Sequence, residues 1–322
     1  MQITVLCGGP SAEREISLIS GNAVAAALRA AGHEVFVSDV SPDYLDGLDH
    51  PADVIFPVLH GAFGESGELQ EILEARNLAF VGSGSLASRL GMDKIAAKQQ
   101  WKIAGLPTPG WEVISSHGRK PVRTPETRGL TTPTAPMQPP IAPPCVVKAI
   151  DSGSSIDVFI CKTPADARAA IDSLIAKHGQ CMVEQFIEGP ELTVGLLEGR
   201  ALPPIRIETS REFFDFKAKY TKGGAKHSFE LNLPEALVER CKTLAEQANR
   251  ILGCRDLARV DIMIDAEQNP YLLEINTIPG FTPVSLLPEA AGKVGISFEQ
   301  LVDRLATIAL ARAPLQRQGQ LC

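Results

Sequence analysis

The fold is decided by two neighbouring runs, Arg259-Val260-Asp261-Ile262-Met263-Ile264-Asp265 and Tyr271-Leu272-Leu273-Glu274-Ile275-Asn276. Successive side chains of a strand point to opposite faces, so in each run the polar residues two positions apart share a face. We expect residues 266–269 to form a four-residue turn, which joins the runs as an antiparallel hairpin.

One face of this hairpin gathers polar side chains. The turn places Asp261 opposite Glu274 and Arg259 opposite Asn276. Two carboxylates and an amide suit hard cations, and an arginine beside them can neutralise charge on a transferred phosphoryl group. A solvated face without a site is the alternative, but the Pro279-Gly280 turn brings backbone NH groups close and favours a site. The other face is expected to pack in the core through Val260, Ile262, Ile264, Leu273 and Ile275.

Length and composition describe an ordinary globular protein. The chain has 322 residues, enough for two or three subdomains, with 44% hydrophobic and 21% charged residues. Its net charge of −7 argues against a general nucleic-acid binder. The seven cysteines lack metal-ligand spacing and indicate reduced thiols in a cytoplasmic protein. The first residues predict a strand rather than a signal peptide, and we expect no membrane partner.

Strands and helices alternate through the first ninety residues, which predicts a parallel sheet covered by helices. A second unit opens at Asp93, which can cap a helix that ends at Gly105. Further on, we expect a polar loop over 215–229 and a long helix over 234–252. The expected strands of the first ninety residues are 3–7, 33–40, 53–59 and 79–81, and the expected helices are 14–31 and 68–75.

Residues 117–144 contain eight prolines and almost no apolar periodicity. Proline fixes φ and lacks an NH donor, so this segment is predicted to be an extended surface loop. A tolerated insertion is favoured over a partner-binding arm. Deletion of 119–142 is therefore expected to leave activity largely intact.

Two central motifs suit a nucleotide. Lys148 is followed by Gly153-Ser154-Ser155, where backbone NH groups and a lysine can hold phosphates, although a short Gly-Ser-Ser run is usually a plain turn. Glu184 to Glu191 can line a nucleotide cleft or, equally, form a hinge between domains.

Three polar positions elsewhere can approach a ligand. Glu13 follows the first strand, at the sheet edge where α/β proteins bind ligands, although Ser11 there can simply cap a helix. His60 ends another strand, where a structural role is the common one. Lys219-Tyr220 in the polar loop can form a lid or remain exposed.

Taken together, these segments resemble the D-alanine–D-alanine ligase family of ATP-grasp enzymes. The resemblance implies an α/β (α+β) ATP-grasp fold with an N-terminal Rossmann-like parallel-sheet domain (1–91), a central lid domain (92–187) and a C-terminal catalytic domain (188–322). It also implies a homodimer. The motifs that carry it are GGPSAEREISLISG (8–21), LHGAFGESGELQ (59–70), MDKIAAK (92–98), GLPTP (105–109), VVKAIDSGSS (146–155), EQFIEGPELTVG (184–195), FFDFKAKYT (213–221), RVDIMID (259–265) and LEINTIPGFTPVSLLPEAA (273–291).

The resemblance further implies ATP, two Mg²⁺ (or Mn²⁺) ions and D-alanine as ligands, and assigns residues to each. The metal ligands are Asp261, Glu274 and Asn276. The ATP-binding residues are Lys94, Lys148, Ser154, Ser155, Glu184, Ile187, Glu191 and Lys219. The substrate-binding residues are Glu13, His60, Arg259, Ser285 and Leu286. The residues of the catalytic step and lid closure are Glu13, Ser154, Tyr220, Arg259 and Gly280.

The implied reaction phosphorylates one D-alanine and lets the amine of a second attack the acyl phosphate, for peptidoglycan precursor synthesis. A different second substrate (D-lactate or D-serine), or an ATP-binding regulatory or scaffold relative without activity, remain as alternatives; Tyr220 and Leu286 favour the dipeptide. Asp157 departs from the family pattern, which has glycine there, and its carboxylate is expected to repel ATP phosphates.

Overall fold

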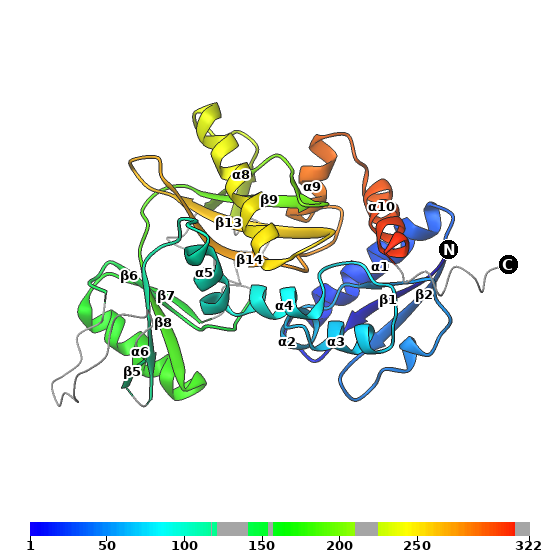
Figure 1. Cartoon of the computed structure of the whole chain (residues 1–322), viewed down its shortest axis with the longest axis horizontal. Helices are drawn as coiled ribbons and strands as arrows, with labels where there is room; N and C mark the ends of the chain where they lie inside the picture. The colour runs from blue at the N-terminus through cyan, green and yellow to red at the C-terminus, as the bar shows by residue number, and fades with distance from the viewer. Residues whose placement is uncertain (117, 121–140, 154–156, 210–224, 313–322) are drawn as a thin grey trace.

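Three β-sheets follow one another along an elongated molecule (Figure 1). The computed structural model describes residues 1–116, 118–120, 141–153, 157–209 and 225–312. Each sheet lies within one of the sequence ranges 1–91, 92–187 and 188–322. The third sheet lies between the other two in Figure 1, so its hairpin can meet both neighbours.

The N-terminal sheet is parallel, as the alternating pattern predicts. Its strand order is β2-β1-β3. Next to β3, the predicted strand at 79–81 is reduced to a single parallel bridge between Ile55 and Phe80. The elements are β1 (Gln2–Gly8), α1 (Arg14–Ala30), β2 (Glu34–Val40), η1 (Asp46–Leu48), β3 (Val54–Pro57), α2 (Ala62–Glu65), α3 (Glu68–Ala75) and α4 (Ser85–Met92).

The central sheet is built from antiparallel pairs in the order β5-β4-β8-β6-β7. The preceding helix starts as expected, because the Asp93 carboxylate accepts hydrogen bonds from the NH groups of Ile95 and Ala96. The elements are α5 (Lys94–Ile103), β4 (Trp111–Ser115), β5 (Gly118–Lys120), β6 (Cys145–Lys148), β7 (Val158–Cys161), α6 (Pro164–His178) and β8 (Gln180–Gln185).

The C-terminal sheet has the order β12-β11-β9-β13-β14, and β10 pairs with β9. Residues 225–228 form strand β12 where the sequence predicted a loop, because they pair with β11; residues 215–224 of that loop lie outside the described residues. The elements are β9 (Glu191–Leu197), β10 (Arg200–Ala201), β11 (Ile205–Thr209), β12 (Ala225–Ser228), α8 (Glu235–Leu252), β13 (Leu257–Ile264), β14 (Pro270–Asn276), α9 (Leu286–Lys293) and α10 (Phe298–Ala311).

The β13–β14 hairpin has the predicted register at its polar end. Asp261 pairs with Glu274 and Arg259 with Asn276. Nearer the turn, Ile262 pairs with Leu272, so one residue of β14 bulges between these two pairs. The bulge reverses the alternation of side chains, and Leu272 is fully buried in the core in place of Leu273. The prediction that Leu273 packs there was therefore wrong, whereas the other four apolar residues do so.

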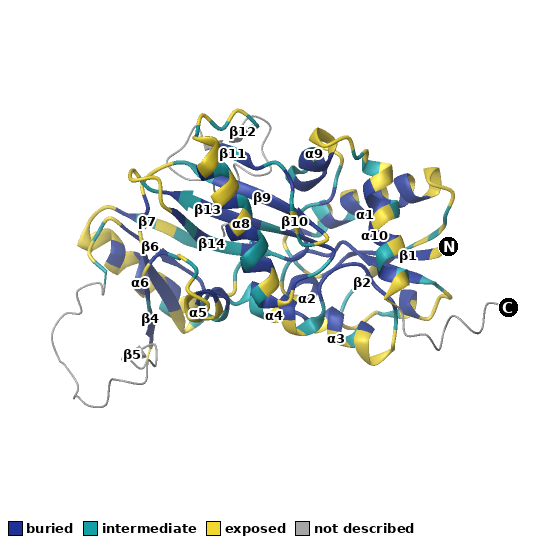
Figure 2. Cartoon of the chain, turned by 45° about the horizontal axis from the view of Figure 1, so that its top comes forward, coloured by how far each residue is buried: buried dark blue, intermediate teal, exposed yellow. Residues whose placement is uncertain are grey.

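The last helix returns to the first sheet. α10 packs against α1 and β3, and its buried leucines share a core cluster with Val5 and Leu28 (Figures 1 and 2). Buried residues fill the interior of the sheets, and the outer faces of the helices are exposed (Figure 2). Helix α10 thus connects the N-terminal sheet with the part of the chain that carries the hairpin.

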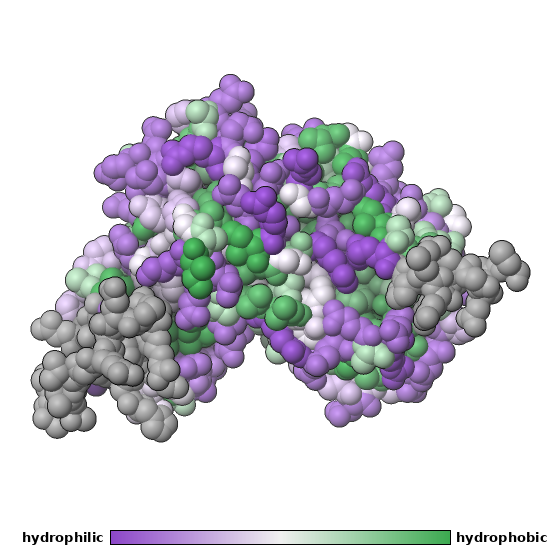
Figure 3. Space-filling model, viewed as in Figure 1, coloured by the Kyte–Doolittle hydropathy of each residue, from purple (hydrophilic) through white to green (hydrophobic). Residues whose placement is uncertain are grey.

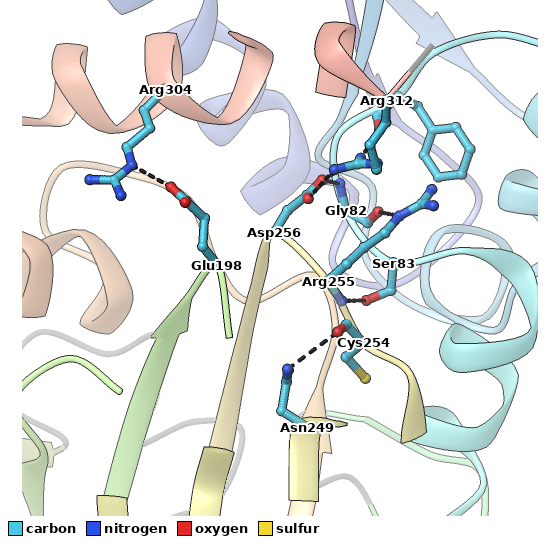
Figure 4. A network of polar contacts seen from close by, with 10 residues as sticks. Gly82, Ser83, Glu198, Asn249, Cys254, Arg255, Asp256, Arg304 and Arg312 are labelled. Atoms are coloured by element: carbon cyan, nitrogen blue, oxygen red, sulfur yellow. Dashed lines mark hydrogen bonds and ion pairs between the residues drawn. The ribbon is translucent and has the colours of Figure 1, made fainter. Parts of the chain in front are cut away.

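A polar network fixes the same junction (Figure 4). Asp256 lies just before β13 and is only 3% exposed; its carboxylate accepts a 2.8 Å hydrogen bond from the NH of Gly82 and pairs with Arg312. Arg255 donates to the carbonyl of Gly82 (2.8 Å), and its own NH donates to Ser83 (3.2 Å). The N-terminal domain is therefore bonded to the strand that presents Arg259.

Hydrophilic residues cover most of the face in Figure 3, and hydrophobic ones gather mainly over α4 and α5. Leu86 of α4 and Ile103 of α5 are among the exposed hydrophobic residues. Within the described residues, no helix has both the length and the apolar character needed to cross a membrane.

We expect deletion of residues 121–140 to leave turnover within about threefold of wild type. The deletion proposed from the sequence, 119–142, includes Arg119 and Lys120, which pair with β4 as part of β5. The shorter deletion keeps that strand and removes only proline-rich chain outside the described residues, which the sequence predicts to be a tolerated insertion. Steady-state kinetics with a thermal melt tests this; lost activity in a folded variant would show that the segment is functional.

Candidate functional site

A cleft of about 670 Å³, counted out to open solvent, lies where the three sheets meet. Residues from all three sequence ranges line it, so several distant motifs converge here. They are Glu13, His60, Glu65, Gly91, Met92, Lys94, Ser152, Gly153, Arg259, Glu274, Ile275, Asn276, Thr277 and Gly280.

The N-terminal wall is acidic around a buried histidine. Glu13 follows β1, and His60 follows β3, at the carboxyl edge of the parallel sheet. The Nδ1 of His60 lies 3.8 Å from Glu65, whose carboxylate also accepts a 2.8 Å hydrogen bond from the NH of Gly61. Burial opposes a charged ring, but the carboxylates of Glu65 and Glu13 outweigh it and raise the pKa of His60. This wall can attract an ammonium group.

Arg259 and Asp261 form a two-bonded ion pair on the floor of the site. The guanidinium donates to the two carboxylate oxygens at 3.0 and 2.9 Å, and Thr193 of β9 donates to the same carboxylate at 2.6 Å. Asp261 is 6% exposed and lies behind Arg259, outside the residues that line the cleft. The pair holds the arginine head in one orientation, which suits stabilisation of a developing negative charge.

The three predicted metal ligands fit Mg²⁺ by donor type. Asp261 and Glu274 are neighbours across the hairpin, and the side-chain oxygen of Asn276 accepts a 2.8 Å hydrogen bond from the NH of Ile278. Carboxylate and amide oxygens are the donors that Mg²⁺ prefers. Among the described residues, no group of three His, Cys, Asp or Glu side chains is assembled for a metal. Asp261 already accepts hydrogen bonds from Arg259 and Thr193, so a metal bound there would share the carboxylate with both.

Four charged residues mark the side where α5, β6 and β8 meet. Lys94 donates to the carbonyl of Ser152 at 2.5 Å and lies 3.7 Å from Glu274. Lys148 and Lys98 hold the two oxygens of Glu184 at 2.6 Å each. Lys94 lines the cleft, whereas Lys148 and Glu184 do not, and the Glu184 carboxylate is enclosed by lysines.

The Asp157 carboxylate is neutralised by its own surroundings. It pairs with Lys177 at 2.6 Å and with His178 at 2.7 Å, both at the end of α6. Burial opposes ionisation, but these two hydrogen bonds lower the pKa of Asp157 overall. The expected repulsion toward ATP phosphates is therefore largely offset. The residue also has a left-handed backbone (φ 59°), which explains why glycine suits this position in the family pattern.

Of the remaining predicted residues, one lines the cleft, four do not, and four lie outside the described residues. Gly280 lines the cleft; in the turn before α9 the Ser285 hydroxyl accepts a 3.0 Å hydrogen bond from the NH of Thr282, and Leu286 begins α9. Ile187 is buried between β8 and β9, and Glu191 begins β9; neither lines the cleft. Ser154, Ser155, Lys219 and Tyr220 lie outside the described residues, so their predicted roles stay untested.

Three residues of this region had been missed in the sequence. Glu65 stands in a Gly-rich stretch, and nothing in that stretch indicates its contact with His60. Thr193 is an ordinary strand residue until β9 pairs with β13. Lys98 alone had a usable signal, since it lies four residues after Lys94 on the same helix face.

Comparison with known protein families gives two matches. The model described as D-ala D-ala ligase C-terminus matches residues 100–307, and the model described as D-ala D-ala ligase N-terminus matches residues 41–83. The first covers more than half of the chain, including the whole hairpin and the Glu184 region.

Individual proteins agree with this. A D-alanine–D-alanine ligase of Stutzerimonas stutzeri is 42% identical over 302 residues, covering 94% of this chain and 92% of the relative. One of Desulforamulus reducens is 41% identical over 315 residues, covering 96% and 99%. The crystal structure of D-alanine–D-alanine ligase from Bacillus anthracis complexed with ATP is similar with a TM-score of 0.78 at 28% identity, covering 97% and 98% of the two chains.

Proposed function

The chain belongs to the D-alanine–D-alanine ligase family, and we propose that the cleft between its three sheets is the site of that reaction. The fold is the ATP-grasp fold, and the protein is an ATP-dependent ligase that joins two D-alanines for peptidoglycan synthesis. The observation that supports this location best is the convergence of Glu13 and His60 with Lys94, Arg259 and Glu274.

The first half-reaction needs a carboxylate turned toward ATP. Glu13 attracts the ammonium group of the first D-alanine, with His60 and Glu65 beside it, so the substrate carboxylate faces the opposite wall. An oxygen of that carboxylate attacks the γ-phosphorus, ADP leaves, and an acyl phosphate remains. Positioning is the main contribution of the protein, because both reactants are held in one orientation.

The nucleotide is held from the side of α5, β6 and β8. Lys94 and Lys148 contact its phosphates, the backbone of the strand end at Glu184 and Ile187 the adenine edge, and Glu191 the ribose. The proposed Mg²⁺ (or Mn²⁺) ligands are Asp261, Glu274 and Asn276; two bound ions would neutralise charge on the phosphate oxygens. Ser154, Ser155 and Lys219 are proposed to complete the phosphate contacts.

In the second half-reaction the amine of the second D-alanine attacks the acyl carbon. The carbonyl oxygen becomes an oxyanion, and Arg259 with the NH of Gly280 stabilises it. The intermediate collapses with loss of phosphate to D-alanyl-D-alanine. Ser285 and Leu286, at the start of α9, receive the carboxylate of the second substrate, where the helix N-terminus favours an anion. Tyr220, Ser154 and Glu13 are proposed to close the lid.

The relatives favour D-alanine over D-lactate or D-serine as second substrate, and an active enzyme over an inactive scaffold, because relatives that cover nearly the whole chain are D-alanine–D-alanine ligases. We further propose that the protein works as a homodimer in the cytoplasm, where ATP is available. The six described cysteines are free and buried, which is consistent with a reducing compartment.

Phosphate release from ATP and Mg²⁺ tests the function directly. We expect release with D-alanine, none with L-alanine, and a dialanine mass as the product, also when D-lactate is added. ATP binding without release in any mixture would contradict the assignment, and a depsipeptide mass would reassign the second substrate.

A further inference from the structure

Lys98 is a buried lysine to which the proposed function gives no role. It lies on α5, is completely buried, and its ammonium group is 2.6 Å from one oxygen of Glu184. The same group donates to the hydroxyl of Thr108 and lies 3.5 Å from the carbonyl of Pro109 and 5.2 Å from the ring centre of Trp111. These contacts on every side fix Lys98 in place.

Lys148 shares Glu184 with Lys98 but is held far more loosely. Its ammonium group reaches the other oxygen of Glu184 at 2.6 Å, and among the described residues this carboxylate is its hydrogen-bond partner. Its side chain keeps slight exposure, whereas that of Lys98 has none. Of the two lysines, Lys148 is therefore the one that can move to a ligand.

The cluster carries more positive than negative charge. Two ammonium groups face one carboxylate, with Glu274 acting on Lys98 only through space. Burial lowers the pKa of Lys98 to about 8, so the group is still mainly charged at neutral pH; both lysines outweigh burial and lower the pKa of Glu184. A surplus buried cation is costly unless an anion arrives, and a nucleotide phosphate is such an anion.

We propose that Lys98 is a positioning residue that stays on Glu184 as its permanent counter-ion and thereby frees Lys148 for the phosphates of the nucleotide. The inference rests on the proposed function, which assigns Lys148 to the phosphates. Without Lys98, Lys148 is the remaining cation on a buried carboxylate. Leaving it for ATP then uncovers an unpaired buried charge, and ATP binding weakens.

The test is ATP affinity, measured by calorimetry on four variants. We expect Lys98→Met to weaken ATP binding by about 10- to 100-fold, the range for a lost bond to a buried charged group. The KM for ATP rises accordingly, while kcat at saturating ATP and the KM for D-alanine stay within about threefold. Lys102→Met, an exposed lysine one turn later on the same helix, keeps wild-type affinity.

The double variant Lys98→Met/Glu184→Gln tests the direction in which ATP affinity changes when the carboxylate is also neutralised. Because a neutral amide at position 184 no longer retains Lys148, the second substitution is expected to restore ATP affinity at least tenfold relative to Lys98→Met alone. A lysine that only stabilises the fold predicts instead that kcat and the KM for D-alanine change along with ATP affinity in Lys98→Met. Unchanged affinity in Lys98→Met, or no restoration in the double variant, overturns the proposal.

Two further comparisons keep the result interpretable. If Lys98→Met does not fold, the double variant, which buries no unpaired carboxylate, must bind ATP as Glu184→Gln does; much weaker binding contradicts the proposal. If the wild-type protein itself fails to bind ATP, the proposed function is wrong. If the wild-type protein binds ATP and Lys98→Met binds it equally well, the inference about Lys98 is wrong but the proposed function is not.

Discussion

Arg259→Ala is expected to lower kcat by about 10³-fold or more, the range for an arginine that stabilises a phosphoryl or acyl transfer transition state. The guanidinium lines the cleft and is held by two bonds to Asp261, so its charge is already in place before the oxyanion forms. ATP binding should change by no more than about threefold, because the nucleotide contacts are assigned to Lys94 and Lys148. Single-turnover phosphate release together with ATP titration measures both.

The same substitution leaves the Asp261 carboxylate buried with Thr193 as its remaining strong donor, and a broken buried pair typically costs about 3 kcal/mol of stability. Arg259→Ala/Asp261→Met therefore serves as a fold control, since it removes both charges. Arg259→Lys keeps the charge but cannot bind both oxygens, and we expect intermediate activity. Near-normal turnover in a folded Arg259→Ala protein would remove Arg259 from the catalytic step.

The hairpin was predictable because its local rules are strong. Alternation placed the polar residues on one face, and the turn length gave the pairing of Asp261 with Glu274. That pairing is correct only because two irregularities cancel: the turn is one residue longer than predicted, and a bulge at Leu273 restores the register. No residue in this stretch predicts a bulge, so the burial of Leu272 could not be inferred from the sequence.

Contacts between distant segments were the harder part. Lys98 and Glu184 are 86 positions apart, as 184 minus 98 gives. They meet because α5 packs through Ile95 against the core cluster that contains Trp111 of β4 and Met182 of β8. The charge of Asp157 was visible in the sequence, but its partners Lys177 and His178 depend on where α6 ends. Sequence patterns identify which groups can do chemistry, whereas the charge around each group depends on tertiary packing.

Glu274→Gln is expected to lower turnover by about 100-fold at low Mg²⁺ and to raise the half-saturating Mg²⁺ concentration by at least about tenfold, since an amide is a weaker ligand for a hard cation than a carboxylate. Glu274 faces the cleft opposite Asp261 and also lies 3.7 Å from Lys94, which keeps its bond to Ser152 in the variant. The fold should therefore survive the change.

The Mg²⁺ dependence separates two roles of the carboxylate. If Glu274 binds the metal, excess Mg²⁺ recovers part of the lost turnover; if it only orients Lys94, the loss is independent of Mg²⁺ and appears as weaker ATP binding. Glu267→Gln is the matched control, because this glutamate is exposed in the turn of the same hairpin. A wild-type Mg²⁺ profile in Glu274→Gln would contradict the metal assignment.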